Sequence, residues 1–381
     1  FKLMSFRDSW INGDRRKADD EELEAIQPIH LVLIEEPEAH LHVQVQQVFI
    51  KNAYDILRNN PMLKNKNAYC TQMIVSTHSS SIALECKFAD LRYFRRTRSV
   101  EGLPISVVIN LSNVFGVSTR TSRFVTRYLR TTHYDLFFAD AAILIEGAGE
   151  RIFMPYFINK YEVLNDSYIS VLEIGGRYAH YLKPLIDTLG ISCLVITDID
   201  CAHGKNNASV KPERGKKYFS SNPTIQNWVV KNADLDYLLN LDSYSKIESN
   251  PNIAEAKTRI AYQKPVKVLF SDKTEHEFIP TTFEDSLAYT NFESFKSMKG
   301  NGLIKKFKKA FKTENATTIP QDVYNAIKSK SVDKAQFALD MIFNKDPQNI
   351  EIPVYIAEGL KWLENEILSK GNNDFLSEEN E

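Results

Sequence analysis

Short apolar segments alternate with amphipathic segments through the middle of the chain. The runs at 141–146, 168–174 and 191–198 are almost entirely apolar, as in strands that are buried on both faces of a sheet. Between them, residues 150–161 and 177–190 carry apolar side chains at helical spacing. Strands and helices that alternate at this length predict a parallel sheet with helices packed on its faces. The expected fold class is therefore α/β.

The regions on either side of this alternation are less regular. Before it, the pattern predicts buried strands at 31–36 and 72–78, strands at 91–96 and 105–111, and a basic helix at 120–133. After it, the polar and basic residues 201–217 predict a loop. A strand is expected at 266–270, and the other segments are expected to be helical: 222–242, 245–263, 283–299, 302–312, 320–330, 333–343 and 354–369.

Composition places the chain among globular proteins. It has 381 residues, of which 43% are hydrophobic and 25% charged, and its formal net charge is −2. No apolar run is long enough to cross a bilayer, and the N-terminus has no secretory pattern. The four cysteines form no CxxC pair, so reduced thiols in a cytoplasmic protein are expected. Because Phe1 opens a predicted helix, we expect a piece of a longer protein.

Acidic residues follow two of the apolar runs. Glu146 ends the first run, and the glycines after it allow a tight turn that brings Glu150 to the start of a helix. Asp198 ends the third run, and Asp200 faces the same way if the chain stays extended. The carboxyl edge of a parallel sheet is where ligands bind. We therefore expect these four carboxylates to lie together at one edge.

Clustered carboxylates raise one another's pKa and need a compensating charge. Ligands that are all carboxylate oxygens suit Mg²⁺ or Mn²⁺ rather than zinc, and a pair of such ions can drive phosphodiester hydrolysis. The simpler interpretation of an acid at a strand end is a helix cap or an ion-pair partner, and it applies to Glu150 taken alone. The combination of E-x3-E with D-x-D, each after an apolar strand, favours a two-metal site.

The segments that carry these acids resemble a known domain. FADAAILIEGAGERIF at 138–153 and LEIGGRYAHYLKPLIDTLGISCLVITDID at 172–200 are similar to the Toprim domain of the overcoming-lysogenization-defect (OLD) family nucleases. This family includes the endonuclease subunit of the Gabija anti-phage system. The resemblance implies a metal-dependent DNA endonuclease whose catalytic metal ligands are Glu146, Glu150, Asp198 and Asp200.

Two further motifs fit the OLD family rather than Toprim domains in general. TFEDSLA at 282–288 looks like the family's late acidic motif, which adds Glu284, and also Asp285, to the metal ligands. DKAQFAL at 333–339 looks like its lysine motif, which makes Lys334 the cation that stabilises the developing charge on the phosphate. A glutamate or lysine within a helix is usually a solvated surface residue, so both assignments depend on the resemblance.

A second resemblance covers the beginning of the chain. LVLIEEPEAHLH at 31–42 resembles the Walker B strand and D-loop of ABC-type ATPases, and MIVSTHSS at 73–80 resembles their switch-histidine strand. The resemblance implies that Glu35 orients the hydration shell of Mg²⁺, Glu36 positions the attacking water and His78 senses the γ-phosphate. No GxxxxGK[ST] loop occurs in the chain, so ATP binding is expected only in a full-length protein that supplies this loop upstream.

These motifs divide the chain into three expected parts. Residues 1–115 are the C-terminal part of an ABC-type ATPase domain, 116–135 a basic connecting helix, and 136–370 a Toprim nuclease domain with helical additions. Because ATPases of this type enclose nucleotide between two subunits, the resemblance implies a homodimer or a higher homo-oligomer. The Gabija type further implies phage defence and a superfamily-one helicase as a partner.

Clusters of basic residues near the acidic motifs suit double-stranded DNA as the substrate. Phosphate contacts are expected from the basic helix and from the loop at 203–217, through Arg120, Arg123, Arg127, Arg130, Lys205, Lys211, Arg214, Lys216 and Lys217. An ordinary solvated surface explains any single cluster as well. Nothing indicates readout of base edges, so no sequence preference is predicted.

Two other functions compete with the nuclease. A Toprim primase or topoisomerase needs a zinc module or a nucleophilic tyrosine on a separate DNA-gate domain, and neither is visible in the sequence. A structural-maintenance-like ATPase that binds DNA or a protein partner would have a non-catalytic Toprim domain, and the intact E-x3-E and D-x-D motifs argue against this. Metal binding that depends on the carboxylates separates this last alternative from the nuclease.

Overall fold

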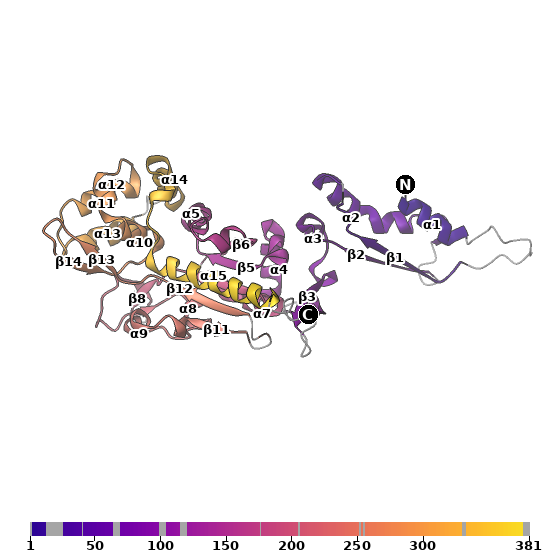
Figure 1. Ribbon diagram of the computed structural model, residues 1–381, viewed down its shortest axis with the longest axis horizontal. Coiled ribbons are helices and arrows are strands. Elements are labelled where there is room, and N and C mark those ends of the chain that lie inside the picture. Colours follow the sequence, from indigo (N-terminus) through magenta and orange to yellow (C-terminus); the bar gives the residue numbers. More distant parts are fainter. Residues whose placement is uncertain are drawn as a thin grey trace, which may run out of the picture. The chain divides into compact units, whose positions relative to one another are not determined.

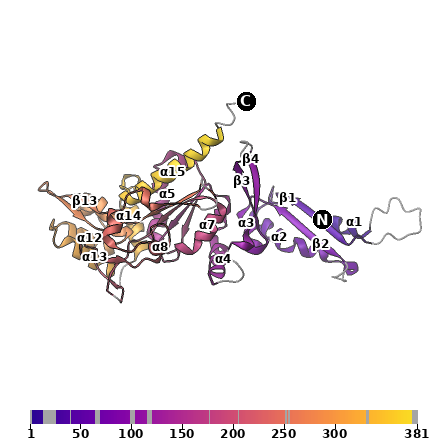
Figure 2. The ribbon, with the colours of Figure 1, turned by 90° about the horizontal axis from the view of Figure 1, so that it is seen from below.

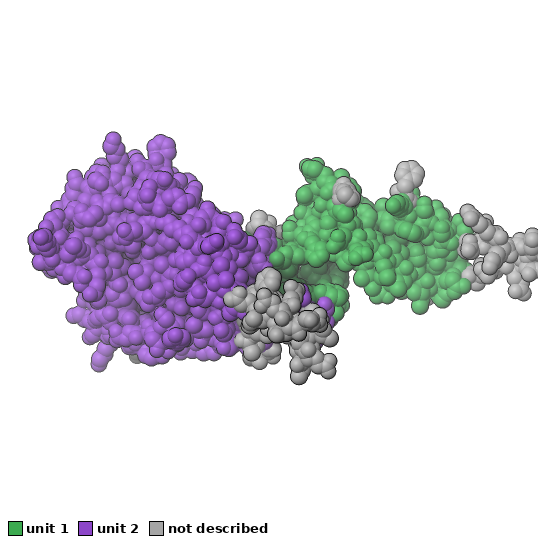
Figure 3. All heavy atoms as spheres, in the orientation of Figure 1, with its two compact units in different colours: residues 1–94, 107–118, 122–138 green, residues 95–106, 119–121, 139–381 purple. Residues whose placement is uncertain are grey.

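The computed structural model divides the chain into two compact units, which Figure 3 colours separately. One unit comprises residues 1–94, 107–118 and 122–138, and the other residues 95–106, 119–121 and 139–381. The structure describes residues 2–12, 26–39, 41–63, 69–98, 104–114, 120–175, 177–204, 206–250, 253, 256–329 and 333–375.

The first unit contains a two-stranded parallel sheet, in which β1 (Ile29–Glu35) pairs with β2 (Cys70–Ser76). Helix α1 (Lys2–Asn12) packs on α2 (Val43–Arg58), and α2 packs on β2 (Figure 1). Burial alternates along β1, because Val32 is buried whereas Leu31 and Leu33 are 53% and 69% exposed. The expectation of a fully buried strand is therefore wrong for one face, since the described helices cover only the other.

Four further elements follow β2 along the chain. They are α3 (Ser80–Glu85), the paired strands β3 (Arg92–Arg98) and β4 (Pro104–Asn110), and α4 (Arg120–Thr132). The strands and the basic helix lie where the sequence predicts them. None of the helices in the described ranges is long and apolar enough to span a membrane.

The second unit is built on a five-stranded sheet in the order β11-β12-β7-β5-β6. The bounds are β5 (Ala141–Ile145), β6 (Ile169–Glu173), β7 (Ser192–Ile196), β11 (Ile247–Ser249) and β12 (Lys257–Ala261). All neighbours are parallel except β11, which is antiparallel at one edge. Every position of β5 and β7 is buried, so the predicted parallel sheet with both faces covered is confirmed.

The helix expected at 245–263 is wrong, because this segment contains β11 and β12. Charged residues on β12 look solvent-exposed in the sequence, so the pattern of apolar positions does not indicate a buried strand there. On β12, Lys257 pairs with Glu366 at 2.9 Å and Arg259 pairs with Glu358 at 3.3 Å, and both glutamates belong to α15 (Val354–Phe375). These glutamates, about a hundred residues further along the chain, offset the cost of placing the charges of Lys257 and Arg259 inside a sheet.

The segment after Asp200 is also more structured than the expected loop. It forms a small antiparallel sheet of β8 (Cys201–His203), β9 (Ala208–Ser209) and β10 (Phe219–Ser220). Two short helices, α8 (Pro223–Asn227) and α9 (Leu235–Asn240), replace the single helix expected at 222–242. The strand expected at 266–270 is β13 (Val266–Leu269), and it pairs with β14 (Glu275–Phe278).

Helices α5 (Ala148–Ile158), α6 (Glu162–Asn165) and α7 (Lys183–Leu189) connect the parallel strands. The C-terminal half adds α10 (Phe283–Thr290), α11 (Phe292–Ser297), α12 (Gly302–Phe311), α13 (Ile319–Lys328) and α14 (Lys334–Asn344), followed by α15. Figures 1 and 2 show α15 crossing the sheet, where it packs on β7 and β12. A Cβ atom at Gly359 would lie 2.8 Å from Leu194, so glycine permits this close approach. One apolar core joins β5, α5 and α10 to α15, which fixes the C-terminal helices against the sheet.

Candidate metal centre

Glu146 and Glu150 flank the turn that joins β5 to α5. Because β5 is buried throughout, its end delivers Glu146 to the carboxyl edge of the sheet. Glu150 lies in the first turn of α5 and is 4% exposed. Gly149 lets this turn approach α10, since a Cβ atom there would lie 3.3 Å from Oε1 of Glu284 and 3.3 Å from Cδ1 of Phe283. The turn thus places acids from two distant segments side by side.

Glu146 is in direct contact with Asp198. Oε2 of Glu146 accepts hydrogen bonds from the backbone N–H of Asp198 at 2.7 Å and from Oγ1 of Thr197 at 2.9 Å. The contact forms because β5 and β7 are parallel neighbours, with Leu144 opposite Val195 near their ends. The two acidic motifs therefore meet at one edge of the sheet.

Two donors from other elements hold the carboxylate of Asp198, which is 3% exposed. Oδ1 accepts hydrogen bonds from Nε2 of Gln263 at 2.7 Å and from the backbone N–H of Phe283 at 3.1 Å. Oδ2 lies 3.6 Å from Nζ of Lys334. Sequence reasoning missed Gln263, because glutamine belongs to no catalytic motif here and its segment was expected to be helical.

Glu284 on α10 and Lys334 on α14 join this cluster. Nζ of Lys334 lies 3.1 Å from Oε2 of Glu284, and Glu284 is only 1% exposed. Apart from this ion pair, neither carboxylate oxygen of Glu284 has a hydrogen-bond partner among the described residues. Asp333 caps α14 by accepting a hydrogen bond from the N–H of Gln336 at 3.0 Å. The cap fixes the helix start from which Lys334 reaches the acids.

Asp200 does not have the extended geometry that the sequence pattern predicts. β7 ends at Ile196, and Asp200 has a φ of 46°, so the chain turns between Asp198 and Asp200. Its carbonyl oxygen accepts hydrogen bonds from the N–H of Ser221 at 2.9 Å and from the hydroxyl at 3.1 Å. The expectation that an extended chain turns both aspartates the same way is thus wrong. The carboxyl of Asp200 nevertheless remains close enough to raise the pKa of Glu146.

Asp285 is directed away from the other acids. Its Oδ2 accepts a hydrogen bond from the N–H of Thr281 at 2.7 Å, and its Oδ1 accepts one from the N–H of Thr282 at 2.7 Å. With Thr282 it forms the capping box of α10. We therefore correct the expectation of Asp285 as a metal ligand, because both oxygens are committed to the cap. The cap instead fixes the preceding residue, Glu284.

Burial and mutual repulsion disfavour the charged forms of the clustered acids. Burial, helped by the carboxylate of Glu284, raises the pKa of Glu150 to about 8. Burial also raises the pKa of Asp198 well above its usual value, and the charge of Glu146 adds to this. Burial opposes the charge on Lys334, but the carboxylates of Asp198 and Glu284 raise its pKa. The cluster therefore contains more carboxyl groups than the single ammonium group of Lys334 can neutralise.

The free oxygens of this cluster suit a hard divalent cation. In the described part of the chain no three His, Cys, Asp or Glu side chains are already arranged around a common metal position, and Lys334 contacts two of the acids. Among the described residues, no hydrogen-bond donor contacts Oε1 of Glu146 and, apart from the lysine contact, none contacts Oδ2 of Asp198 or either oxygen of Glu284. Buried carboxylate oxygens without donors fit Mg²⁺ or Mn²⁺, which take oxygen ligands.

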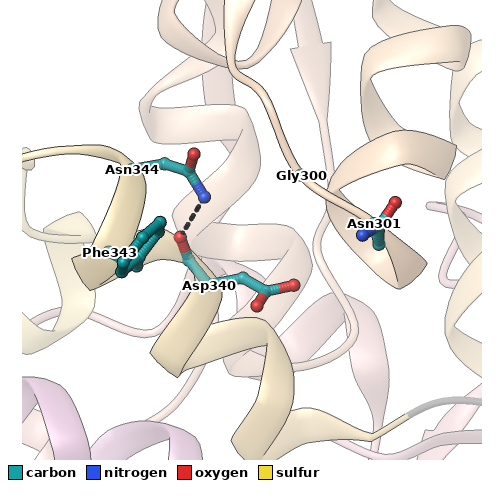
Figure 4. Close-up of a pocket in the computed structure, with 5 residues that line it drawn as sticks. All are labelled: Gly300, Asn301, Asp340, Phe343 and Asn344. Atoms are coloured by element: carbon teal, nitrogen blue, oxygen red, sulfur yellow. Dashed lines mark hydrogen bonds between the residues drawn. The ribbon is translucent and has the colours of Figure 1, made fainter.

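A surface hollow at the end of α14 does not belong to this cluster. It has a volume of about 310 Å³ and is lined by Gly300, Asn301, Asp340, Phe343 and Asn344 (Figure 4). Nδ2 of Asn344 donates a hydrogen bond to the carbonyl of Asp340 at 2.6 Å there. Lys334 stands at the opposite end of α14, about 15 Å away at the rise of an α-helix. The hollow therefore contributes no residue to the acidic centre.

The predicted ATPase residues lie at one end of the small sheet of the first unit. Strands β1 and β2 bring Glu35 and Glu36 to the same end as His78, and Oε1 of Glu36 lies 3.3 Å from Nε2 of His78. Sequence reasoning missed Glu38, whose Oε1 accepts hydrogen bonds from Oγ1 of Thr77 at 2.8 Å and from the N–H of His78 at 2.6 Å. Glu38 thereby ties the segment after β1 to the segment after β2.

The basic helix α4 exposes Arg123 and Arg127 to solvent. These residues are four positions apart and share one face of the helix. The side chains of Arg120 and Arg130 lie outside the described part of the structure, as does His40 of the expected D-loop.

The cations after β8 differ in how far they are neutralised. Lys216 and Lys217 are exposed and make no ion pair with the described residues. Two others are paired, at 3.0 Å and 3.3 Å: Lys211 with Glu213, and Arg214 with Glu277. Lys205 lies outside the described residues.

Comparison with known families agrees with this geometry. Residues 137–200 match the family described as "Overcoming lysogenization defect protein-like, TOPRIM domain", and residues 9–83 match "AAA ATPase domain". The chain is thus a TOPRIM protein with an AAA ATPase-like region before the TOPRIM domain. Over these segments it is similar to proteins of the overcoming-lysogenization-defect (OLD) family.

Two similar proteins carry nuclease names. "Endonuclease GajA" of Bacillus cereus (strain HuB5-5) is 30% identical over 358 residues, which are 88% of this chain and 48% of that protein. "OLD nuclease" of Thermus scotoductus is 29% identical over 181 residues, which are 45% of this chain and 31% of that protein. The chain therefore spans about half the length of the first relative and about a third of the second.

Two solved structures are similar at low identity. The C-terminal region of the Burkholderia pseudomallei OLD protein has a TM-score of 0.35 and 17% identity, and covers 60% of this chain and 99% of that chain. The C-terminal region of the Xanthomonas campestris pv. campestris OLD protein has a TM-score of 0.32 and 15% identity, and covers 62% of this chain and 98% of that chain.

Proposed function

We propose that this chain carries the nuclease centre of a divalent-metal-dependent DNA endonuclease, which an ABC-type ATPase module regulates. The TOPRIM match and the relatives named endonuclease and nuclease support a phosphodiester hydrolase. The proposal adds two Mg²⁺ or Mn²⁺ ions as cofactors, double-stranded DNA as the substrate and anti-phage defence in the cytoplasm as the setting.

One observation carries the proposal, namely the contact between Glu146 and Asp198. Acids follow two neighbouring parallel strands, the carboxylate of Glu146 accepts a hydrogen bond of 2.7 Å from the backbone N–H of Asp198, and the buried Glu150 and Glu284 lie beside them. Acids at this density repel one another and lose hydration, which is unfavourable without cations. An all-oxygen cluster that needs positive charge, at the carboxyl edge of a parallel sheet, supports a metal-dependent hydrolase.

The residues have separate roles in this proposal. Oε1 of Glu146, Oδ2 of Asp198 and the carboxylate of Glu284 would hold the cations, with Glu150 and Asp200 completing the set. Bound cations supply a water of lowered pKa and balance charge on the phosphate.

Lys334 and Asp285 act on this set in different ways. Lys334 places an ammonium group beside two carboxylates, where it can also balance the charge that develops on the phosphate. Asp285 acts only through the cap of α10, which orients Glu284.

The first unit is proposed to serve ATP hydrolysis in a longer protein. Glu35, Glu36 and His78 would contribute to it once a phosphate-binding loop is supplied from elsewhere. A homodimer or higher homo-oligomer encloses the nucleotide in this proposal. A superfamily-one helicase is the proposed protein partner.

Nicking of supercoiled plasmid tests the nuclease directly. The chain, or the longer parent protein, is incubated with plasmid and Mg²⁺ or Mn²⁺, and nicked circles are followed on agarose gels. We expect nicking that EDTA abolishes and that Asp198→Asn slows at least ~100-fold, because the substitution removes a metal-binding charge.

The matched control is Asp322→Asn, since Asp322 is exposed on α13 and lies outside the acidic cluster. It should nick at the wild-type rate. The proposal is wrong if neither protein nicks DNA with either metal, or if Asp198→Asn nicks as fast as Asp322→Asn.

A further inference from the structure

Two buried amides surround the pair of strand-end acids, and each has one possible orientation. Gln263 is 1% exposed, and its Oε1 accepts a hydrogen bond of 2.7 Å from the backbone N–H of Ile199. A backbone N–H can only donate, so this bond fixes which end of the amide is oxygen. Nε2 must then face Oδ1 of Asp198, to which it donates at 2.7 Å.

Asn222 is held in the same way and is fully buried. Its Oδ1 accepts a hydrogen bond of 2.9 Å from the N–H of Thr224, so Nδ2 donates to Oγ1 of Thr197 at 2.8 Å and to the carbonyl of Asp198 at 2.8 Å. Since Oγ1 of Thr197 already accepts a hydrogen bond, its own hydrogen is free to point at Oε2 of Glu146, 2.9 Å away. Asn222 thus orients the hydroxyl that binds Glu146.

Each strand-end acid therefore has one oxygen held by the protein and one oxygen left over. On Asp198, Gln263 and the backbone of Phe283 hold Oδ1, and Oδ2 remains. On Glu146, Thr197 and the backbone of Asp198 hold Oε2, and Oε1 remains. Neither acid can rotate without breaking two hydrogen bonds.

We infer that Gln263 and Asn222 are positioning residues, which make Asp198 and Glu146 one-oxygen ligands with a fixed direction toward the metal. This inference rests on the proposed function for the existence of the metal, and it adds which residues set the ligand geometry. Both amides are neutral, so Gln263 holds Asp198 directly, and Asn222 holds Glu146 through Thr197, without adding charge to the cluster. Groups that orient metal ligands in this way typically change metal affinity 10- to 100-fold when they are removed.

Calorimetric titration with Mn²⁺ alone tests the inference on the intact chain, without any nuclease assay. Gln263→Leu replaces the amide by an apolar side chain and so removes the donor to Asp198, and we expect Mn²⁺ to bind about tenfold more weakly. The titration is done at a temperature at which circular dichroism shows the variant to be folded. Its melting temperature in EDTA is recorded in parallel.

Gln46 in the other compact unit provides a matched control. It is 8% exposed, its Nε2 donates to the carbonyl of Leu41 at 2.9 Å, and its Oε1 accepts from the hydroxyl of Ser79 at 2.7 Å. Gln46→Leu therefore removes a similarly bonded, buried amide that has no hydrogen bond to an acid among the described residues. It should lower the melting temperature and leave Mn²⁺ affinity at the wild-type value. Equal losses of affinity in both variants would mean general destabilisation and overturn the inference.

A second pair of variants keeps the inference testable if Gln263→Leu does not fold. Thr197→Val loses the hydroxyl that binds Glu146, and Thr197→Ser keeps it. We expect about tenfold weaker Mn²⁺ binding for valine and near wild-type binding for serine. Wild-type affinity in Thr197→Val, and in Gln263→Leu if it folds, overturns the inference. If the wild-type chain itself binds no Mn²⁺, the proposed function fails first, and the two failures are distinguishable.

Discussion

Nζ of Lys334, at the start of α14, lies 3.1 Å from Oε2 of Glu284 on α10, and α14 packs on α5 beside the carboxyl edge of the sheet. The same ammonium group lies 3.6 Å from Oδ2 of Asp198. These are two of the oxygens that a metal ion would use. In the metal-free protein Lys334 therefore acts as the counter-ion of the cluster, and a bound cation competes with it for the same carboxylates.

This competition gives Lys334→Met opposite effects on binding and on catalysis. Mn²⁺ affinity should be unchanged or higher, because a competing positive charge has been removed. Plasmid nicking should fall about 10²- to 10³-fold, because the charge that stabilises the reacting phosphate has gone. Calorimetry gives the affinity and gel analysis gives the rate.

A lysine on α15 provides the comparison for this variant. Lys361 pairs with Glu364 at 2.8 Å and is 63% exposed, so Lys361→Met should alter neither quantity. If Lys334→Met weakens Mn²⁺ binding tenfold, Lys334 is part of the metal-binding framework rather than its competitor.

The raised pKa of Glu150 makes the metal-free protein less stable as the pH rises. Its pKa is about 8 in the folded chain and about 4.5 in the unfolded chain, so between these values the folded state holds a proton that the unfolded state has lost. Stability is therefore lost as the pH rises from about 4.5 to about 8. Glu150→Gln cannot ionise, and in EDTA it should raise the free energy of unfolding by about 4 kcal/mol at pH 8 and by close to zero at pH 4.5.

Urea titrations at several pH values measure this difference. Glu162→Gln is the control, because Glu162 is exposed at the start of α6, and it should change the free energy of unfolding by less than about 0.5 kcal/mol at every pH. An effect of Glu150→Gln that does not depend on pH would contradict the raised pKa. Mg²⁺ should also raise the melting temperature of the wild type more at pH 8 than at pH 5.

Alanine substitutions at two glycines of one turn distinguish the effect of crowding at the metal centre from the effect of helix propensity. A Cβ atom at Gly149 would press on Oε1 of Glu284 at 3.3 Å, whereas a Cβ atom at Gly147 would lie 3.6 Å from Oε2 of Glu150, an ordinary contact. We expect Gly149→Ala to weaken Mn²⁺ binding about three- to tenfold through the displaced Glu284. Its free energy of unfolding should change by less than about 1 kcal/mol, because alanine favours the helix. Gly147→Ala should bind Mn²⁺ as the wild type does, and equal affinities for both variants would rule out crowding.

DNA binding should depend most on the basic residues that pair with no acid in the described part of the chain, which include Arg123 and Arg127. In an Asp198→Asn background, replacing both Arg123 and Arg127 by Ala should reduce the slope of log affinity against log salt by about 1.8, or 0.9 for each phosphate that is no longer neutralised. Arg214→Ala should change the slope less, because Arg214 already pairs with Glu277 at 3.3 Å. Fluorescence anisotropy of a labelled duplex at several salt concentrations measures the slopes. An unchanged slope for the double variant removes α4 from the DNA interface.

The sequence predicted the parallel core because local pattern and tertiary position agree there. The runs that became β5 and β7 are apolar on both faces, as two-sided burial requires. β12 could not be predicted in this way, because Lys257 and Arg259 look solvent-exposed until Glu366 and Glu358 of α15 are placed beside them. These glutamates come next to β12 only in the folded chain, so a short stretch of sequence around β12 cannot reveal them.

The residues of the candidate site also fall into two groups, those that the local sequence marks and those that only the fold marks. Glu146 and Asp198 were predictable because each follows an apolar strand. The capping role of Asp285 could have been predicted from the Thr-x-x-Asp spacing that begins at Thr282, but the neighbouring family motif took precedence. Gln263 gave no signal, because only its hydrogen bonds in the fold mark it as a partner of Asp198.

β7 and β12 are adjacent in the sheet, although the chain leaves β7 at Ile196 and begins β12 only at Lys257. The excursion between them contains β8, β9, β10, α8, α9 and the edge strand β11. Asp200 lies in its first turn, Asn222 lies within it at the start of α8, and Gln263 follows β12. Evolution can therefore lengthen, shorten or replace the parts of this excursion that hold neither Asn222 nor β11, and so remodel the surface near the acids, while the strand pairing and the ligand set stay as they are.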